Sequence, residues 1–192
     1  RIQETLLRRA MAEIGGLPGR PDGPGLSFNL SLRTPVDPMF AGAVREWAAE
    51  AGFPIERLAF EISEQMLTKC DERTLATLAD LADGGVRLIV DDFGNNLAAF
   101  RFLARLRVAR VKFDRHLIRD IEREPAHRAA LEALVELSAS LGFGVVAKGV
   151  ESDSQRRALE EMGCRYMQGF AFHAPLDLAE LEKMIRRTRL KS

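Results

Sequence analysis

Apolar positions at the start of the chain recur at helical spacing. Ile2, Leu6, Leu7, Met11 and Ile14 fall among Arg, Gln and Glu residues, which predicts an amphipathic helix from the first residues to about residue 14. Two glycines follow it, and residues 15–25 are rich in Gly and Pro with little apolar content. This segment is therefore predicted to be an internal loop of one domain over residues 1–192, and not a linker between two domains.

After this loop, short apolar segments alternate with helical patterns. Strands are predicted at residues 26–32, 58–62, 86–90, 108–113, 143–147 and 166–172. Helices are predicted at residues 35–51, 71–83, 97–106, around 131–135, at 152–162 and around 178–185. Near-continuous apolar strands that alternate with helices indicate a parallel α/β sheet. No glycine-rich dinucleotide turn or phosphate loop follows the first strand, which favours a (β/α)8 TIM-like barrel over an open nucleotide-binding sheet. Such a barrel usually takes about 250 residues, so this chain is one or two units short.

Composition and charge narrow the classes of partner. The 192 residues include 28 Lys and Arg against 28 Asp and Glu, so no overall basic field attracts nucleic acid, and we expect no DNA or RNA partner. No apolar run is long enough to span a bilayer, which predicts a cytoplasmic chain or the cytoplasmic part of a larger protein. Cys70 and Cys164 lie far apart, so neither a disulfide framework nor a zinc site is expected. His116, His127 and His173 show no ligand spacing and are predicted to lie at the surface.

Polar residues stand at the carboxyl end of each predicted strand: Asn29, Glu61, Asp91, Asp92, Lys112, Asp114, Lys148, Glu151 and Gln168. Parallel barrels build their active sites on this rim. Carboxylate and amide oxygens there are suited to Mg²⁺ or Mn²⁺, and two adjacent ions can hold a phosphodiester while activating a water. Each residue taken alone also fits a helix cap, a rim ion pair or an ordinary strand end, and only their coincidence on one rim favours a site.

Six segments, in order along the chain, resemble the EAL domain family, whose members are phosphodiesterases that open the bacterial second messenger cyclic di-GMP to linear pGpG. The Asp91-Asp92-Phe93-Gly94 segment is identical to the family's signature. The other segments are similar to family motifs and comprise Phe28-Asn29-Leu30-Ser31, Phe60-Glu61-Ile62-Ser63-Glu64, Lys112-Phe113-Asp114-Arg115, Ala147-Lys148-Gly149-Val150-Glu151 and Gln168-Gly169-Phe170 with Pro175.

The resemblance implies a modified (β/α)8 barrel that lacks its first strand-helix unit in this chain. It implies metal ligands at Asn29, Glu61, Asp91 and Asp92, with Mg²⁺ or Mn²⁺ as the cofactor if the domain is active. It places Lys112 near the attacking water and Glu151 in the catalytic region, while Glu64 braces the loop after Asp92. The residues expected near the nucleotide are Asp114, Gln168, Phe170, Phe172 and Pro175.

Three departures from the family pattern bear on catalysis. The strand with the Glu-Ala-Leu signature would lie upstream of Arg1, and residues 95–99 read Asn-Asn-Leu-Ala-Ala where the family usually has Thr-Gly-Tyr-Ser-Ser. Lys148 stands where the family has a Glu of the catalytic metal centre. We expect its ammonium to lie among Asp91, Asp92 and Glu61 as a substitute for one cation; the alternative is that Lys148 extends into solvent.

Three functions therefore remain open. The leading hypothesis is a degenerate EAL domain that binds cyclic di-GMP as a receptor or regulatory module with little or no hydrolysis and with no required metal. The alternatives are an active phosphodiesterase dependent on Mg²⁺ or Mn²⁺, and a protein-interaction scaffold without nucleotide. The expected partners are cyclic di-GMP, a second copy bound through the region after Asp92, and further domains or proteins of a larger parent.

Overall fold

The computed structural model describes residues 2–17, 23–30, 36, 38–94, 99–103 and 105–189, with side chains to residue 187. The chain divides into two compact units. The first contains Arg1–Phe60, Asp71–Arg87 and Pro175–Ser192, and the second contains Glu61–Cys70 and Leu88–Ala174. Most of the polar residues predicted for the rim belong to the second unit.

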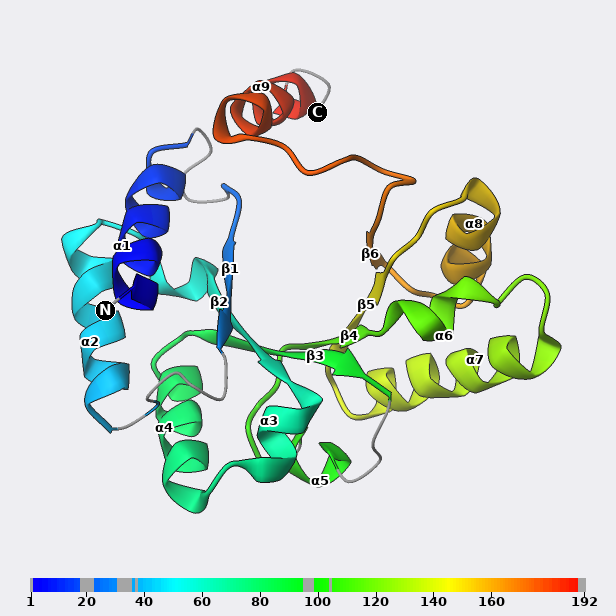
Figure 1. Ribbon diagram of the computed structural model, residues 1–192, viewed down its shortest axis with the longest axis horizontal. Helices are drawn as coiled ribbons and strands as arrows, with labels where there is room; N and C mark the ends of the chain where they lie inside the picture. Colours follow the sequence, from blue (N-terminus) through cyan, green and yellow to red (C-terminus); the bar gives the residue numbers. More distant parts are fainter. Residues whose placement is uncertain are drawn as a thin grey trace. The chain divides into compact units, whose positions relative to one another are not determined.

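Six strands form one sheet in the order β1-β2-β3-β4-β5-β6, so sequence neighbours are also neighbours in the sheet (Figure 1). The strands are β1 (Leu26–Leu30), β2 (Leu58–Ser63), β3 (Arg87–Phe93), β4 (Arg110–Phe113), β5 (Gly144–Lys148) and β6 (Tyr166–Gln168). The pairs β3·β4, β4·β5 and β5·β6 are parallel. The parallel sheet predicted from the alternating pattern is thus confirmed.

Helices follow most of the strands. They are α1 (Ile2–Gly15), α2 (Pro38–Glu50), α3 (Glu64–Lys69), α4 (Glu72–Asp83), α5 (Phe100–Leu103), α6 (Arg115–Arg119), α7 (Pro125–Ser140), α8 (Asp153–Glu161) and α9 (Leu178–Arg189), with a 3-10 turn η1 (Ile55–Arg57). Side-chain caps mark the start of two of these helices. Asp71 caps α4, and Ser152 and Gln155 form a reciprocal capping box at α8. Such caps fix where each helix begins, and therefore where the preceding loop ends.

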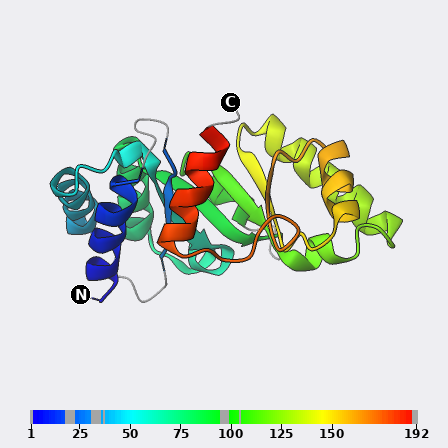
Figure 2. The same ribbon diagram turned by 90° about the horizontal axis from the view of Figure 1, so that it is seen from above.

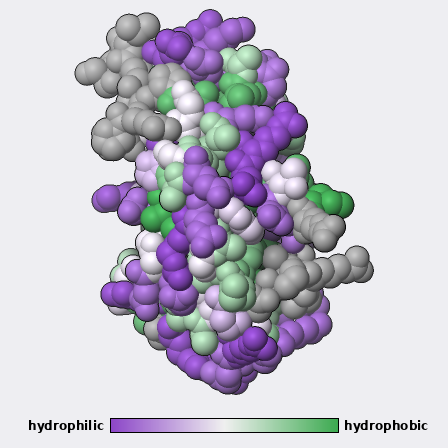
Figure 3. Space-filling model, turned by 90° about the vertical axis from the view of Figure 1, so that its left-hand side faces the viewer, coloured by the Kyte–Doolittle hydropathy of each residue, from purple (hydrophilic) through white to green (hydrophobic). Residues whose placement is uncertain are grey.

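In the first unit, α1 buries Leu7 and Met11 but leaves Ile2 and Leu6 exposed. Hydrophilic residues are spread over the face that carries α1 and α2, with apolar residues between them (Figure 3). Arg45 of α2 reaches Asp80 of α4, with 3.1 Å between Nη2 and Oδ2. These helices therefore bury one apolar stripe each and present the opposite face to solvent.

In the second unit, the core lies between the central strands and their helices. Phe93 at the end of β3 meets Phe100 edge-on at 4.9 Å and stacks with Phe113 of β4 at 6.4 Å between ring centres. Helices α6 and α7 pack against β5 (Figure 2). A rigid set of buried strands thus carries the strand ends that hold the polar residues.

The structure corrects several predicted boundaries. Strand β6 ends at Gln168 and not at residue 172, because the N–H groups of Phe172 and His173 both turn back to the Gly169 carbonyl. Gly169 also lies against Val150, where a Cβ would come within 2.1 Å of the Val150 oxygen, so only glycine fits this turn. Helix α5 is shorter than predicted, although residues 95–98 and 104 lie outside the described part, and the short helices α3 and α6 were not predicted.

Among the described residues, no helix has both the length and the apolar content that crossing a membrane requires. All three histidines are exposed, as the sequence predicted.

Candidate functional site

The ends of β2, β3, β4 and β5 bring three carboxylates and two lysines of the second unit together in two clusters. Lys148 is the last residue of β5, and Lys112 precedes the last residue of β4. Because parallel strands place their carboxyl ends at the same edge of a sheet, residues distant in sequence meet here. The register pairs Lys112 with Val146 and Lys148 with Gln168.

The Lys148 ammonium binds both aspartates of β3. Its Nζ lies 2.6 Å from Asp91 Oδ1 and 2.8 Å from Asp92 Oδ1, so it donates a charge-assisted hydrogen bond to each carboxylate. The Lys148 side chain is 25% exposed, against 17% for Asp91 and 53% for Asp92. This cluster therefore lies at the boundary between the interior and solvent.

A bulge in β3 explains how two consecutive aspartates reach one ammonium. Three residue steps from Val90 to Phe93 match only two steps from Val111 to Phe113 on β4, so β3 carries one extra residue there. Successive side chains on a regular strand point to opposite faces, but Asp92 has φ of 53° and its N–H donates to Asp91 Oδ1 at 2.9 Å. Aspartate tolerates this left-handed conformation better than most residues do.

The two hydrogen bonds also change the titration of the lysine. Burial favours the neutral amine and would lower the pKa of Lys148, but the hydrogen bonds and charges of Asp91 and Asp92 outweigh burial and raise it. The ammonium is therefore charged at neutral pH.

The second cluster is a more enclosed ion pair. Lys112 Nζ lies 2.5 Å from Glu61 Oε1, and the two side chains are 13% and 9% exposed. Glu61 belongs to β2, within the buried run of that strand. The sequence predicted that Lys148 lies among Asp91, Asp92 and Glu61. In the structure Lys148 binds the two aspartates, and Glu61 binds Lys112 instead.

The residues present do not fit a divalent metal ion. A metal needs carboxylate lone pairs, but Asp91, Asp92 and Glu61 each direct an oxygen at a lysine ammonium within 2.8 Å. Within the described ranges, no group of three or more His, Cys, Asp or Glu side chains is placed to hold a metal ion. The cationic positions are occupied by lysine nitrogens in this arrangement.

The remaining predicted residues lie as follows. Asp114 caps α6 through its Oδ1, which accepts from the His116 N–H at 2.8 Å. Glu64 begins α3 and is buried. Asn29 lies on β1 in the first unit with an exposed side chain, and Pro175 is an exposed residue of the same unit. In the second unit, exposed side chains belong to Glu151, Gln168, Phe170 and Phe172.

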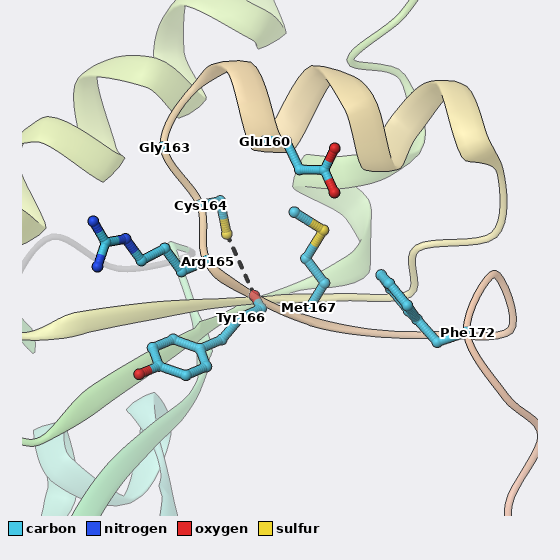
Figure 4. Close-up of a pocket in the computed structure, with 7 residues that line it drawn as sticks. All are labelled: Glu160, Gly163, Cys164, Arg165, Tyr166, Met167 and Phe172. Carbon is cyan, nitrogen blue, oxygen red and sulfur yellow. Dashed lines mark hydrogen bonds between the residues drawn. The ribbon is translucent and has the colours of Figure 1, made fainter. Parts of the chain in front are cut away.

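A pocket of about 230 Å³ lies directly beyond Lys148. Arg115, His116 and Arg119 of α6 line it with Gly149, Glu151 and Gln155. Sequence reasoning did not select Arg119, because nothing in the local pattern shows that α6 faces α8. A larger pocket of about 560 Å³ lies beside β6 and is lined by Glu160, Cys164, Arg165, Tyr166, Met167 and Phe172 (Figure 4).

Comparison with known proteins shows the family to which the chain belongs. The family model described as EAL domain matches residues 1–175. The cyclic di-GMP phosphodiesterase NbdA of Pseudomonas aeruginosa is 34% identical over 146 residues, which cover 76% of this chain and 19% of NbdA. The chain thus spans only about a fifth of that relative's length.

Solved structures give the same result. The EAL domain of Mycobacterium smegmatis DcpA superposes with a TM-score of 0.85 at 28% identity, covering 97% of this chain and 85% of that domain. Klebsiella pneumoniae BlrP1, solved as a manganese and cyclic di-GMP complex, gives 0.79 at 28% identity over 89% of this chain and 43% of BlrP1. The match of the family model over most of the chain, the strand-end residues and the partial (β/α)8 fold lead to one conclusion: this chain belongs to the EAL domain family.

Proposed function

We propose that this chain is a degenerate EAL domain that binds cyclic di-GMP as a receptor or regulatory module with little or no hydrolysis. The observation that carries the proposal is the Lys148 ammonium bound between the Asp91 and Asp92 carboxylates. Metal-dependent hydrolysis of a phosphodiester needs carboxylates that are free to ligate the metal. In this chain a lysine ammonium is already paired with both of them.

Features suited to binding a cyclic dinucleotide are retained beside this cluster. Gln168 is paired in register with Lys148, and it is followed by Phe170 and Phe172, which are 72% and 47% exposed as residues. An exposed aromatic face can stack on a purine, and such stacking contributes about 1–3 kcal/mol for each base. Family membership, together with the named ligand of BlrP1, makes cyclic di-GMP the first nucleotide to test.

Calorimetric titration tests the proposal directly. Cyclic di-GMP is added to the protein with Mg²⁺ and again with a chelator, and the nucleotide is recovered for chromatography. We expect binding in both buffers with the cyclic form intact. Conversion to pGpG with Mg²⁺ alone would support the active phosphodiesterase instead, and no binding in either buffer would support the scaffold.

A matched pair of variants locates the nucleotide. Because Phe170 is largely exposed, Phe170→Ala leaves the fold intact and is expected to raise Kd about tenfold. Leu141→Ala removes another exposed apolar side chain, 52% exposed at the end of α7, and is expected to leave Kd unchanged. Equal Kd values for both variants would contradict the proposal that a base of cyclic di-GMP stacks on Phe170.

Two further expectations belong to this proposal. We propose a cytoplasmic receptor that forms a homodimer through the region after Asp92 and that works with other domains of a larger protein. Residues 95–98 of that region lie outside the described part of the chain. Size-exclusion chromatography with light scattering, with and without cyclic di-GMP, tests the dimer.

A further inference from the structure

We infer that Lys148 is an internal counter-ion that excludes divalent cations from this rim, and that replacing it by an acid creates a metal site at Asp91 and Asp92. The inference goes beyond nucleotide binding, because it concerns the cation preference of the protein alone. It is carried by the geometry of the two clusters and by their charges.

The first step is the count of charges. Glu61, Asp91 and Asp92 supply three negative charges, and Lys112 and Lys148 supply two positive charges at 2.5–2.8 Å from them. Two ammonium groups carry the same charge as one divalent ion. The carboxylates are therefore already neutralised to the extent that one such ion would provide.

The second step is position. Ca²⁺ binds carboxylate oxygens at about 2.3–2.6 Å and Mg²⁺ at about 2.0–2.1 Å. The Lys148 nitrogen lies 2.6 and 2.8 Å from its two oxygens, close to where an ion bridging Asp91 and Asp92 would stand. An ion and the ammonium cannot share this place, because two like charges repel strongly where water is partly excluded.

The third step is that the backbone holds the arrangement. The bulge in β3 and the left-handed Asp92 direct both carboxylates to one point, and Lys148 ends β5 within the paired part of the sheet. Removal of the ammonium would therefore leave two convergent carboxylates behind. A carboxylate at position 148 would extend from the same backbone position toward them.

The fourth step separates the two lysines. Lys112 is enclosed with Glu61, whereas Lys148 is partly exposed and bridges two acids. Substitution of Lys148 is therefore the change that makes the Asp91 and Asp92 carboxylates available to a metal ion with the least disturbance of the core. Lys112 keeps its own partner when Lys148 is replaced.

Manganese binding without any nucleotide tests the inference. Free Mn²⁺ gives a sharp electron paramagnetic resonance signal that is lost on binding, so titration of the protein with MnCl₂ gives Kd directly. We expect no stoichiometric binding by the wild-type protein. We expect Lys148→Glu to bind one Mn²⁺ at least about a hundredfold more tightly than the wild type does, with Lys148→Gln between them.

Controls make each outcome decisive. Lys183→Glu makes the same charge change on an exposed residue of α9 and is expected to behave as the wild type. Circular dichroism establishes that each variant is folded, and Lys148→Gln, which adds no negative charge, decides the matter if Lys148→Glu unfolds. Tight Mn²⁺ binding by the wild type that Asp91→Asn abolishes would overturn the inference, as would folded variants at position 148 that gain no affinity. Since no nucleotide is present, these outcomes are independent of whether the chain binds cyclic di-GMP.

Discussion

Two lysine–carboxylate clusters at neighbouring strand ends differ in burial and in number of partners. Lys112 and Glu61 form a closed pair with side chains 13% and 9% exposed, whereas Lys148 bridges Asp91 and the half-exposed Asp92. A buried pair is costly to break, because the partner left behind is a desolvated charge. A pair at the solvent boundary costs less, because water solvates the remaining groups. The Lys112–Glu61 pair is thus suited to stabilising the fold, whereas Lys148 can be replaced at a lower cost in stability.

The largest expected effect is on the closed pair. Lys112→Met leaves the Glu61 carboxylate buried without its ammonium and is expected to lower the free energy of unfolding by about 3 kcal/mol. Urea denaturation measures this change. The double variant Lys112→Met with Glu61→Gln is expected to regain part of the loss, because no uncompensated charge remains. A loss below about 1 kcal/mol in the single variant would show that the pair behaves as a surface pair does.

A smaller effect is expected at the bridged lysine. Lys148→Met removes two charge-assisted hydrogen bonds at a partly exposed position, and we expect a loss of about 1 kcal/mol by the same measurement. Added salt is expected to screen this contribution more than that of Lys112, since exposed charges are screened more than buried ones. Equal losses in the two single variants would remove the distinction between the clusters.

The smallest effect is a dependence on alkaline pH. Burial alone would lower the pKa of Lys148, but Asp91 and Asp92 outweigh this effect, so the pKa is raised in the folded protein. Its stabilising contribution is therefore complete below the ordinary lysine pKa of about 10.4 and is lost as pH rises through the raised value. The difference in unfolding free energy between the wild type and Lys148→Met is expected to shrink above about pH 10. A constant difference from pH 8 to 11 would contradict this linkage.

The order of strands and helices could be predicted from the sequence, because it depends on local patterns. Ser152 and Gln155 indicate a helix start within four residues, and the apolar run of β3 indicates a buried strand wherever it lies in the fold. The end of β6 was missed, because it depends on Gly169 lying against Val150, a contact between residues distant in sequence.

The sequence indicated several of the charged residues that meet at these strand ends, but not how they pair. The sequence grouped Lys148 with Asp91, Asp92 and Glu61, and the structure gives Glu61 to Lys112 instead. Periodicity treats Asp91 and Asp92 as facing opposite sides of a strand. Only the bulge, which no propensity reveals, turns both carboxylates to one nitrogen.

The presence of lysine at position 148 also has a consequence for the evolution of such a domain. Both lysine codons become glutamate codons by the same exchange of A for G at the first base. An ammonium between Asp91 and Asp92 and a third carboxylate beside them are therefore separated by a single point mutation. A population that carries this domain can therefore acquire either lysine or glutamate at position 148 without a third residue as an intermediate. The bulge that directs Asp91 and Asp92 to one point is compatible with both residues.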